Sequence, residues 1–362
     1  MSIRILHLIS NLSGGGAERQ LSYLAPELAR IGHDVHLGYT KNCPNNPELP
    51  DVTLHYFKTR SNYDPNLLWQ LIRLIRSIKP DIIHTWILQM DILGGLMARV
   101  NGVPWIFREP SSAMAYPPTW KNQLRVWVCS GANAVVSNSR GGEEYWKTQL
   151  KHCRCYVVPN GLPVDEIGGI EAALPPGLSI TEAPIVLYVG RLTSDASAAK
   201  NLNIFLEVLN CVRQRQNVLG VLSGDGPQRH ELEVLRHRLG LEEDVQFTGH
   251  LPANSVWALM KKASVFVSLS AYEGCPNAVM ESVECGCPVV LSDIPAHREL
   301  LDRSCAVFVD PSDIQKTADA IVHVLCDADA SRARALIAKQ KTKEWSIDKM
   351  ARNYERIYRD IL

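Results

Sequence analysis

Short apolar runs alternate with helix-period segments along the chain, and this alternation restricts the fold more than any other feature. The first apolar run, Ile3 to Ser10, is followed by a glycine turn at residues 14–16. A helical face from Ala17 to Leu28 and a second apolar run from Val35 to Tyr39 come next. Parallel strands need long crossover connections, usually helices, so this order favours a parallel α/β sheet over a sandwich or a bundle.

The same pattern continues in two series. The first series has predicted strands at Ile82–Thr85, Trp105–Arg108 and Ala134–Asn138, and predicted helices at Leu67–Ile78, Ile92–Val100, Asn122–Cys129 and Gly142–Leu150. The second series has predicted strands at Ile185–Arg191, Val218–Ser223, Val245–Thr248, Val265–Ser270, Val289–Asp293 and Ala306–Asp310. We therefore expect two doubly wound, Rossmann-like parallel-sheet domains that face a central cleft.

Breaker residues between the two series place the domain boundaries. Residues 169–183 contain Leu-Pro-Pro-Gly-Leu-Ser and are predicted to be a linker. The N-terminal domain is expected over 1–168 and the C-terminal domain over 184–342. The last segment, 343–362, has helical apolar spacing, and it needs an apolar surface to cover.

The composition of the 362 residues excludes two classes of protein. Apolar residues make up 46 %, which is too many for a disordered chain. Lysine plus arginine (38) equals aspartate plus glutamate (38), so no overall basic field indicates nucleic-acid binding. Residues 1–170 carry a net charge of +4 and the remainder carries −4. An ordinary solvated surface is the favoured interpretation of this difference, and help for the first half in approaching an anionic surface is the alternative.

The ten cysteines are expected to be reduced. No apolar run reaches the ~18 residues of a membrane span, and the N-terminus runs directly into a strand, so a cytoplasmic location is expected. The pairs Cys153/Cys155 and Cys285/Cys287 do not have the spacing of a zinc site. We expect neither disulfides nor a metal.

Three segments carry side chains or backbone groups suited to a charged, hydroxyl-rich ligand. The turn Gly14-Gly15-Gly16 follows a strand and opens a helix, where free N–H groups bind anions, although a plain tight turn is the alternative. Its spacing is not that of a dinucleotide-binding loop. Arg191 ends a strand and Lys200 precedes a helix, so both cations are expected at the cleft edge and suit a diphosphate; solvated surface cations are the alternative.

The segment Glu273-Gly-Cys-Pro-Asn-Ala-Val-Met-Glu281 is the most informative. Glu273 lies in a loop after a predicted strand, and Glu281 lies about one turn inside the following helix. Carboxylates repel phosphate and bind hydroxyl groups, while cations and helix N–H groups take the anion. A ligand with both kinds of group is a nucleotide sugar. The alternative for Glu281 is a residue that only complements the helix dipole.

The ordered motifs resemble those of the family-4 retaining glycosyltransferases, which have the GT-B fold. They are Gly-Gly-Ala-Glu at 15–18, Pro-Asn-Gly at 159–161, Val-Gly-Arg at 189–191, Lys200-Asn201, Gly-Asp-Gly-Pro at 224–227, Thr-Gly at 248–249, and the pair Glu273 and Glu281. The resemblance covers nearly the whole chain. It implies no cofactor and no metal, with a nucleoside-diphosphate sugar as the donor substrate.

The resemblance also implies roles for single residues. The catalytic set is Arg191, Lys200 and Glu273, where the two cations hold the diphosphate and Glu273 orients the sugar. The donor-binding set is Gly15, Gly16, Thr248, Gly249, Leu251, Gly274, Cys275, Pro276, Asn277 and Glu281. The last helix is expected to cross back to the N-terminal domain, as in this fold.

Two departures from the family pattern concern the site. Residues Thr193 to Ala199 look like a short insertion before Lys200. Many members carry a histidine after the strand at Trp105–Phe107, where this chain has Arg108-Glu109. Either of these two residues takes that position, or the histidine is absent. Further acceptor-side candidates are His84, which a satisfied strand-end histidine explains equally well, and the apolar residues Trp86, Met90, Met114, Tyr116 and Trp120. Ordinary loop packing explains these apolar residues equally well.

Asp327-Ala-Asp329 matches a metal motif of another glycosyltransferase fold, but no strand leads into it, and we interpret it as a helix cap. The resulting hypothesis is transfer of a hexose or N-acetylhexosamine, with retention, from a nucleotide sugar to a hydroxyl of a lipid-linked or cell-surface saccharide. Contact with the inner membrane surface is part of this hypothesis. The alternatives are a catalytically impaired nucleotide-sugar-binding protein and a nucleotide-sugar epimerase.

Overall fold

The computed structural model describes residues 1–12, 15–41, 46–61, 64–111, 119–178, 182–193 and 200–362. The chain divides into two compact units. Unit 1 contains Met1–Gly161 and Trp345–Leu362, and unit 2 contains Leu162–Glu344. The Pro-rich segment 169–183 therefore groups with unit 2 where it is described. Two predicted features, the acceptor-side candidates Met114 and Tyr116 and the insertion after Thr193, lie outside the described residues.

Unit 1 is built on a parallel sheet. Within the described residues it has seven strands in the order β3-β2-β1-β4-β5-β6-β7. Their bounds are β1 Arg4–Asn11, β2 Asp34–Lys41, β3 Val52–Tyr56, β4 Ile82–Trp86, β5 Trp105–Glu109, β6 Ala134–Ser137 and β7 Arg154–Val157. The chain order reverses between β1 and β4, which makes this the switch point of the sheet.

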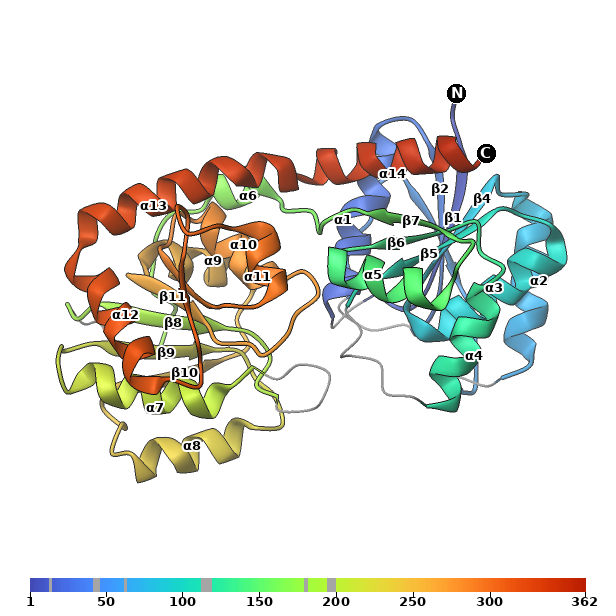
Figure 1. The fold of residues 1–362 in the computed structure, drawn as a ribbon. Helices are drawn as coiled ribbons and strands as arrows, with labels where there is room; N and C mark the ends of the chain where they lie inside the picture. The colour runs from blue at the N-terminus through green and yellow to red at the C-terminus, as the bar shows by residue number, and fades with distance from the viewer. Residues whose placement is uncertain (13–14, 42–45, 62–63, 112–118, 179–181, 194–199) are drawn as a thin grey trace. The chain divides into compact units, whose positions relative to one another are not determined.

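Helices cover both faces of this sheet (Figure 1). Helix α1 (Gly16–Arg30) and helix α14 (Ile347–Ile361) share one hydrophobic core with the sheet. A second core holds the helices of the opposite face, which are α2 Asn66–Ile78, α3 Ile87–Asn101, α4 Trp120–Cys129 and α5 Arg140–Gln149. The apolar stripe of the C-terminal segment is thus buried in unit 1, through Met350, Tyr354 and Ile357 among others.

Alternation along the strands decides which face each side chain meets. On β4, Ile82 and Trp86 enter the core under α14, whereas Ile83 enters the core under α2 to α5. On β5, Ile106 and Trp105 divide in the same way. Successive residues of a strand point to opposite faces, so the polar residues of these strands are also sorted between the two cores.

Unit 2 repeats the architecture. Within the described residues its parallel sheet has six strands in the order β10-β9-β8-β11-β12-β13. Their bounds are β8 Ile185–Val189, β9 Leu219–Ser223, β10 Val245–Gly249, β11 Val265–Ser268, β12 Val289–Ser292 and β13 Val307–Val309. The helices are α6 Val164–Gly169, α7 Leu202–Arg213, α8 Arg229–Arg238, α9 Ala253–Lys262, α10 Asn277–Glu284, α11 Pro295–Leu300, α12 Ile314–Cys326 and α13 Ala328–Lys341, followed by the 3₁₀ turn Thr342–Trp345.

The strand and helix predictions agree with these elements, with ends displaced by one to a few residues. Strands β3 and β7, at two edges of the first sheet, were not predicted from the sequence. Asp327 accepts a hydrogen bond from Ala330 N and begins α13, so the interpretation of Asp327-Ala-Asp329 as a helix cap is confirmed. Among the helices of the described segments, none is both long and apolar enough to cross a bilayer.

Candidate active site

The candidate site in unit 2 lies at the switch point of its sheet. Strands β8 and β11 are neighbours in the sheet, although two strands separate them along the chain. Arg191 follows β8, and Glu273 follows β11. Ligands of open parallel sheets bind beyond the carboxyl ends of the strands at this point. The loops after β8 and β11 therefore carry the predicted catalytic residues in the expected place of the fold.

Lys200 and Glu273 form an ion pair across these two loops. Lys200 Nζ lies 2.5 Å from Glu273 Oε1, and the hydroxyl of Ser270 donates to the same oxygen at 2.7 Å. Both charged side chains are largely but not completely buried, with 19 % and 15 % of their surface exposed. A pair at the rim of a sheet remains accessible to a ligand and is held more firmly than a surface pair.

The backbone around Lys200 fixes this arrangement. Asn201 has a left-handed conformation with φ of 53°, and its side-chain amide donates to Leu269 O at 2.8 Å. Asparagine tolerates this region better than most residues do. The bond joins the start of α7 to the end of β11, so Lys200 is tied to the Glu273 loop by a second contact beside the ion pair.

Backbone hydrogen bonds hold the Arg191 loop. Leu192 N donates to Asp225 O, and Gly190 N donates to Ser223 O, both at 3.0 Å. A side chain at Gly224 would bring its Cβ to 2.0 Å from Gly190 O, so only glycine permits this close approach. The Arg191 side chain is exposed, and within the described residues no carboxylate pairs with it. Its charge is therefore available to an anionic ligand.

Most of the predicted donor-binding residues follow other strand ends of unit 2. Thr248 and Gly249 end β10, Leu251 follows them, and Gly224 N donates to Gly249 O at 2.9 Å. Residues 274–276 lie between Glu273 and α10, Asn277 begins α10, and all four are half-buried or buried. Glu281 is inside α10 with 4 % of its surface exposed. These positions are compatible with donor binding, and their roles stay predictions.

In unit 1 the predicted anion loop is at the start of α1. Gly15 is the N-cap residue, and Gly16 is the first helical residue. The Glu18 carboxylate lies over Gly15, since a Cβ added there would be 2.3 Å from Glu18 Oε2. Burial raises the pKa of Glu18. The Glu18 carboxylate occupies the positive end of the α1 dipole, where a phosphate would bind. An incoming phosphate therefore has to displace this side chain.

Three acceptor-side candidates lie in the core beneath α14. His84 Nδ1 is 2.8 Å from the Tyr358 hydroxyl, and its ring stacks on Trp86 at 4.9 Å. Arg108 donates to Asn160 Oδ1 at 2.6 Å and to the Tyr354 hydroxyl, and it lies over Trp86. All three side chains are 1 % exposed or less. Only one ring nitrogen of His84 is bonded, because its Nε2 is buried without a hydrogen-bond partner among the described residues. The burial of these three side chains gives no support to a direct contact with an acceptor, and their roles stay predictions.

Glu109 lies on the opposite face of the sheet, in a buried polar cluster. Arg125 donates to Asp91 Oδ2 at 2.8 Å and to Glu109 Oε2 at 3.2 Å, and Trp146 Nε1 donates to Glu109 Oε2 at 2.7 Å. Burial raises the pKa of Asp91 to about 6, although Arg125 opposes this. Glu109 Oε1 also accepts from Ser111 N at 2.8 Å. Glu109 therefore supports the loop after β5 from inside.

The sequence analysis did not predict two contacts between a buried polar side chain and the backbone. Gln20 on α1 binds both backbone groups of Gly161, with its Oε1 2.6 Å from Gly161 N and its Nε2 3.1 Å from Gly161 O. His297 on α11 is buried and donates from Nδ1 to Ser292 O at 2.8 Å. The Pro-Asn-Gly motif contains Gly161, but nothing in the sequence indicates its partner 141 residues away.

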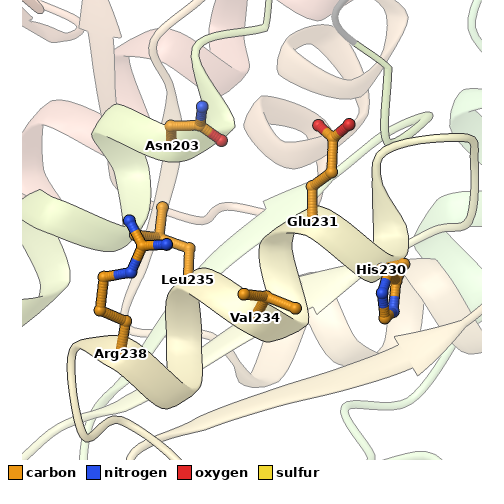
Figure 2. Close-up of a pocket in the computed structure, with 6 residues that line it drawn as sticks. All are labelled: Asn203, His230, Glu231, Val234, Leu235 and Arg238. Carbon is orange, nitrogen blue, oxygen red and sulfur yellow. The ribbon is translucent and has the colours of Figure 1, made fainter.

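A surface cavity of about 320 Å³ lies elsewhere in unit 2 (Figure 2). Its lining comes from α7 and α8 and consists of Asn203, His230, Glu231, Val234, Leu235 and Arg238. It contains none of the predicted site residues. In the parts of the chain that the structure describes, no cluster of three or more histidine, cysteine or acidic residues is arranged to hold a metal ion.

Comparisons with known proteins define the class. The model described as "Glycosyltransferase Family 4" matches residues 14–166, and the model described as "Glycosyl transferases group 1" matches residues 183–327. The chain is thus a glycosyltransferase with two Rossmann-like domains, as in the GT-B fold. It belongs to the family-4-like glycosyltransferases.

Relatives and solved structures agree with this. The α-D-kanosaminyltransferase of Streptomyces kanamyceticus is 23 % identical, with all of both chains covered. A Campylobacter jejuni transferase, named as a 4-α-N-acetylgalactosaminyltransferase acting on a diphospho-undecaprenol-linked saccharide, is 25 % identical over 95 % of this chain and 96 % of its own. The crystal structure of Anabaena HepE with UDP and glucose has a TM-score of 0.83 at 18 % identity, covering 99 % and 100 % of the two chains, and this shows the same fold.

Proposed function

We propose that this glycosyltransferase transfers a hexosyl or N-acetylhexosaminyl group from a nucleoside-diphosphate sugar to a hydroxyl group, with retention at the anomeric carbon. The observation that carries the proposal is the position of Arg191, Lys200 and Glu273 on loops after β8 and β11, at the sheet switch point. Two cations and a carboxylate there suit a diphosphate joined to a polyol. Transferase relatives along the whole chain add support.

The proposed reaction breaks the bond between the anomeric carbon and the diphosphate oxygen. Arg191 and Lys200 stabilise the negative charge that grows on the leaving diphosphate. Glu273 accepts hydrogen bonds from sugar hydroxyls and orients the ring. An acceptor hydroxyl then attacks the anomeric carbon from the face that the diphosphate leaves, and its proton passes to a diphosphate oxygen. Attack on this face preserves the anomeric configuration.

We propose a lipid-linked saccharide as the acceptor. Two Campylobacter jejuni relatives are named for transfer to undecaprenol-linked saccharides, and a Xanthomonas campestris relative is named for a diphosphopolyprenol-linked one. The mildly basic first half of this chain suits work at the inner, anionic face of a membrane. Charge neutralisation is assigned to side chains and backbone N–H groups, with no metal and no cofactor.

Donor hydrolysis without an acceptor tests the proposal. The purified chain is incubated with UDP-, GDP- and dTDP-sugars, and release of the nucleoside diphosphate is measured together with the shift in melting temperature. A donor that is both bound and slowly hydrolysed is the expected result, because binding to the native state raises the melting temperature. Binding without release identifies the non-catalytic alternative, and conversion to an isomeric nucleotide sugar identifies an epimerase.

A further inference from the structure

Helices α2, α3 and α4 form the outer layer on one face of the unit 1 sheet (Figure 1). Helix α3 packs against both α2 and α4. We call the exposed apolar and basic residues of these three helices, together with Lys79, the C-cap of α2, the α2–α4 surface. They are Trp69, Arg73, Arg76, Lys79, Arg99, Val100, Trp120, Lys121 and Trp127.

Tryptophan is concentrated on this surface. All eight tryptophans of the chain lie in the described residues, and the three that are exposed are Trp69, Trp120 and Trp127, at 59 %, 63 % and 62 %. Trp120 and Trp127 are seven residues apart on α4 and so share one face of that helix. An ordinary solvated helix turns its largest apolar side chains inward, and this one turns two of them outward.

Basic residues accompany these tryptophans. The Arg73 guanidinium lies 5.5 Å from the centre of the Trp69 ring, and the Lys121 ammonium lies 5.7 Å from that of Trp120. Each contact holds a cation beside an exposed ring. Helices α2 and α4 contain no acidic residue, and the acidic residue of α3, Asp91, is completely buried.

The charge of the surface is therefore of one sign. Its exposed charged residues are the five cations Arg73, Arg76, Lys79, Arg99 and Lys121, because the three helices have no exposed acidic residue. A second copy of this surface would bring five cations against five others, which disfavours a symmetric dimer here. An anionic partner with an apolar layer beneath its charges fits both the cations and the tryptophan rings.

We propose that the α2–α4 surface docks unit 1 on an anionic lipid bilayer. The basic side chains contact lipid phosphates, and the tryptophan rings enter the headgroup region, where amphipathic aromatic rings are stable. The biological role of this docking rests on the proposed function, since it brings the enzyme to the layer that holds a lipid-linked acceptor. Docking itself needs no turnover.

Vesicle binding tests the proposal. The full chain is sedimented with vesicles of phosphatidylglycerol and phosphatidylcholine in about equal parts, and with vesicles of phosphatidylcholine alone. Binding to the anionic vesicles that falls with added salt is expected. Each cation near such a surface contributes about fivefold in affinity, so Arg73→Glu with Arg76→Glu weakens binding by at least about 25-fold. Trp69→Ala with Trp127→Ala also weakens binding to the anionic vesicles. The factor by which it does so depends little on the salt concentration, because the lost contribution is apolar.

Matched controls come from exposed residues of unit 2. Arg332→Glu with Lys343→Glu reverses two exposed cations, and Leu336→Ala removes a side chain that is 65 % exposed. Both leave vesicle binding unchanged if the α2–α4 surface is responsible. Melting temperature and donor hydrolysis without vesicles are measured for each variant and are expected to match the unmodified chain, because none of the substituted residues belongs to the candidate active site.

Three results overturn the proposal. These are equal binding to anionic and neutral vesicles, full binding by both α2–α4 variants, and a dimer in light scattering that the tryptophan variant dissociates while vesicles recover no protein. Vesicle binding without any donor hydrolysis contradicts the proposed function and leaves the docking surface intact. The two proposals therefore fail separately.

Discussion

Lys200 Nζ lies 2.5 Å from Glu273 Oε1, so the cation assigned to the diphosphate is paired with the carboxylate assigned to the sugar. The pair joins the loops that follow β8 and β11, the two strands at the switch point of the unit 2 sheet. A diphosphate that takes Lys200 has to compete with Glu273. The carboxylate is then released toward the hydroxyl groups of the same donor, so one ligand replaces both halves of the ion pair.

Glu273→Gln separates these two roles. Without the carboxylate charge, Lys200 no longer has an anionic partner, so the nucleoside diphosphate product should bind about threefold to tenfold more tightly. Turnover should fall on the order of 100-fold, because the amide orients the sugar hydroxyls less well. Calorimetry with the product and a donor hydrolysis assay measure the two effects.

The matched variant is Lys200→Met, which should weaken both product binding and turnover. In the double variant the gain from Glu273→Gln should disappear, because it depends on the freed ammonium group. Weaker product binding by Glu273→Gln would contradict the competition between Glu273 and the diphosphate.

Arg191→Ala should lower turnover by about 100- to 1,000-fold at unchanged stability. The side chain is exposed and has no carboxylate partner among the described residues, so its removal costs the fold little, while the leaving diphosphate loses a cation. Steady-state hydrolysis and thermal unfolding check the two parts. Arg238→Ala, which removes another exposed arginine of unit 2 on α8, is the control. Turnover by Arg191→Ala that equals this control would remove Arg191 from the mechanism.

The regular elements were predictable because buried parallel strands and amphipathic helices leave local patterns. Ile3 to Ser10 and Val265 to Ser270 are apolar runs bounded by turn residues, and both contain strands. No residue of strand β3 or β7 is buried. Strand β3 alternates apolar and polar residues over only five positions, and the apolar part of β7 is shorter than the runs above. Edge strands of this kind are defined by their partner in the sheet, which the local sequence does not contain.

The candidate site was predictable where it depends on position along a strand. Arg191 and Glu273 follow β8 and β11, and parallel topology alone brings the ends of these strands to one edge. His84 and Arg108 also lie on strands, but whether such a residue is exposed depends on what covers that face. Here α14, more than 200 residues away, supplies the hydroxyls of Tyr358 and Tyr354 as their partners.

Gly224→Ala should be among the most destabilising single substitutions in unit 2. The new Cβ would lie 2.0 Å from Gly190 O, and the backbone has φ of +139°. The Gly190 carbonyl belongs to the loop that carries Arg191, so both stability and turnover should suffer. We expect a loss of about 3 kcal/mol or more in the free energy of unfolding, measured by urea denaturation.

Alanine substitutions at two other glycines distinguish the steric effect of the close contact at Gly224 from the effect of its positive φ. Gly286 has φ of +74° with open space around it, so Gly286→Ala should cost about 1 kcal/mol. A Cβ added at Gly168, on helix α6, would meet no atom within 4 Å, and this glycine has no left-handed φ. Gly168→Ala should therefore be neutral or slightly stabilising, because alanine suits a helix better than glycine does. If Gly224→Ala lowered the free energy of unfolding no more than Gly286→Ala does, the close approach of Gly224 to the Gly190 carbonyl would be contradicted.

Acid should destabilise unit 1 through its buried histidines. Burial lowers the pKa of His7 to about 3 and that of the neighbouring His84 well below its usual value. Below about pH 6.5 the unfolded chain binds protons that the folded chain excludes, so the free energy of unfolding falls as the pH falls through this range. The stabilisation is fully present above pH 6.5 and is lost progressively toward pH 3. Each histidine contributes a slope of up to about 1.4 kcal/mol per pH unit.

His7→Asn tests this sign. Asparagine does not titrate, and its side-chain oxygen can accept the hydrogen bond that Trp86 Nε1 donates to His7 Nδ1 at 3.2 Å. Urea denaturation at about pH 7.5 and pH 5 should show that the variant loses on the order of 2 kcal/mol less than the unmodified chain over this interval. His152→Asn, which removes a surface imidazole of the same unit, is the control. An equal acid response in the unmodified chain and His7→Asn would mean that His7 takes up its proton in the folded state, and the core beneath α14 would then have to accommodate a charge.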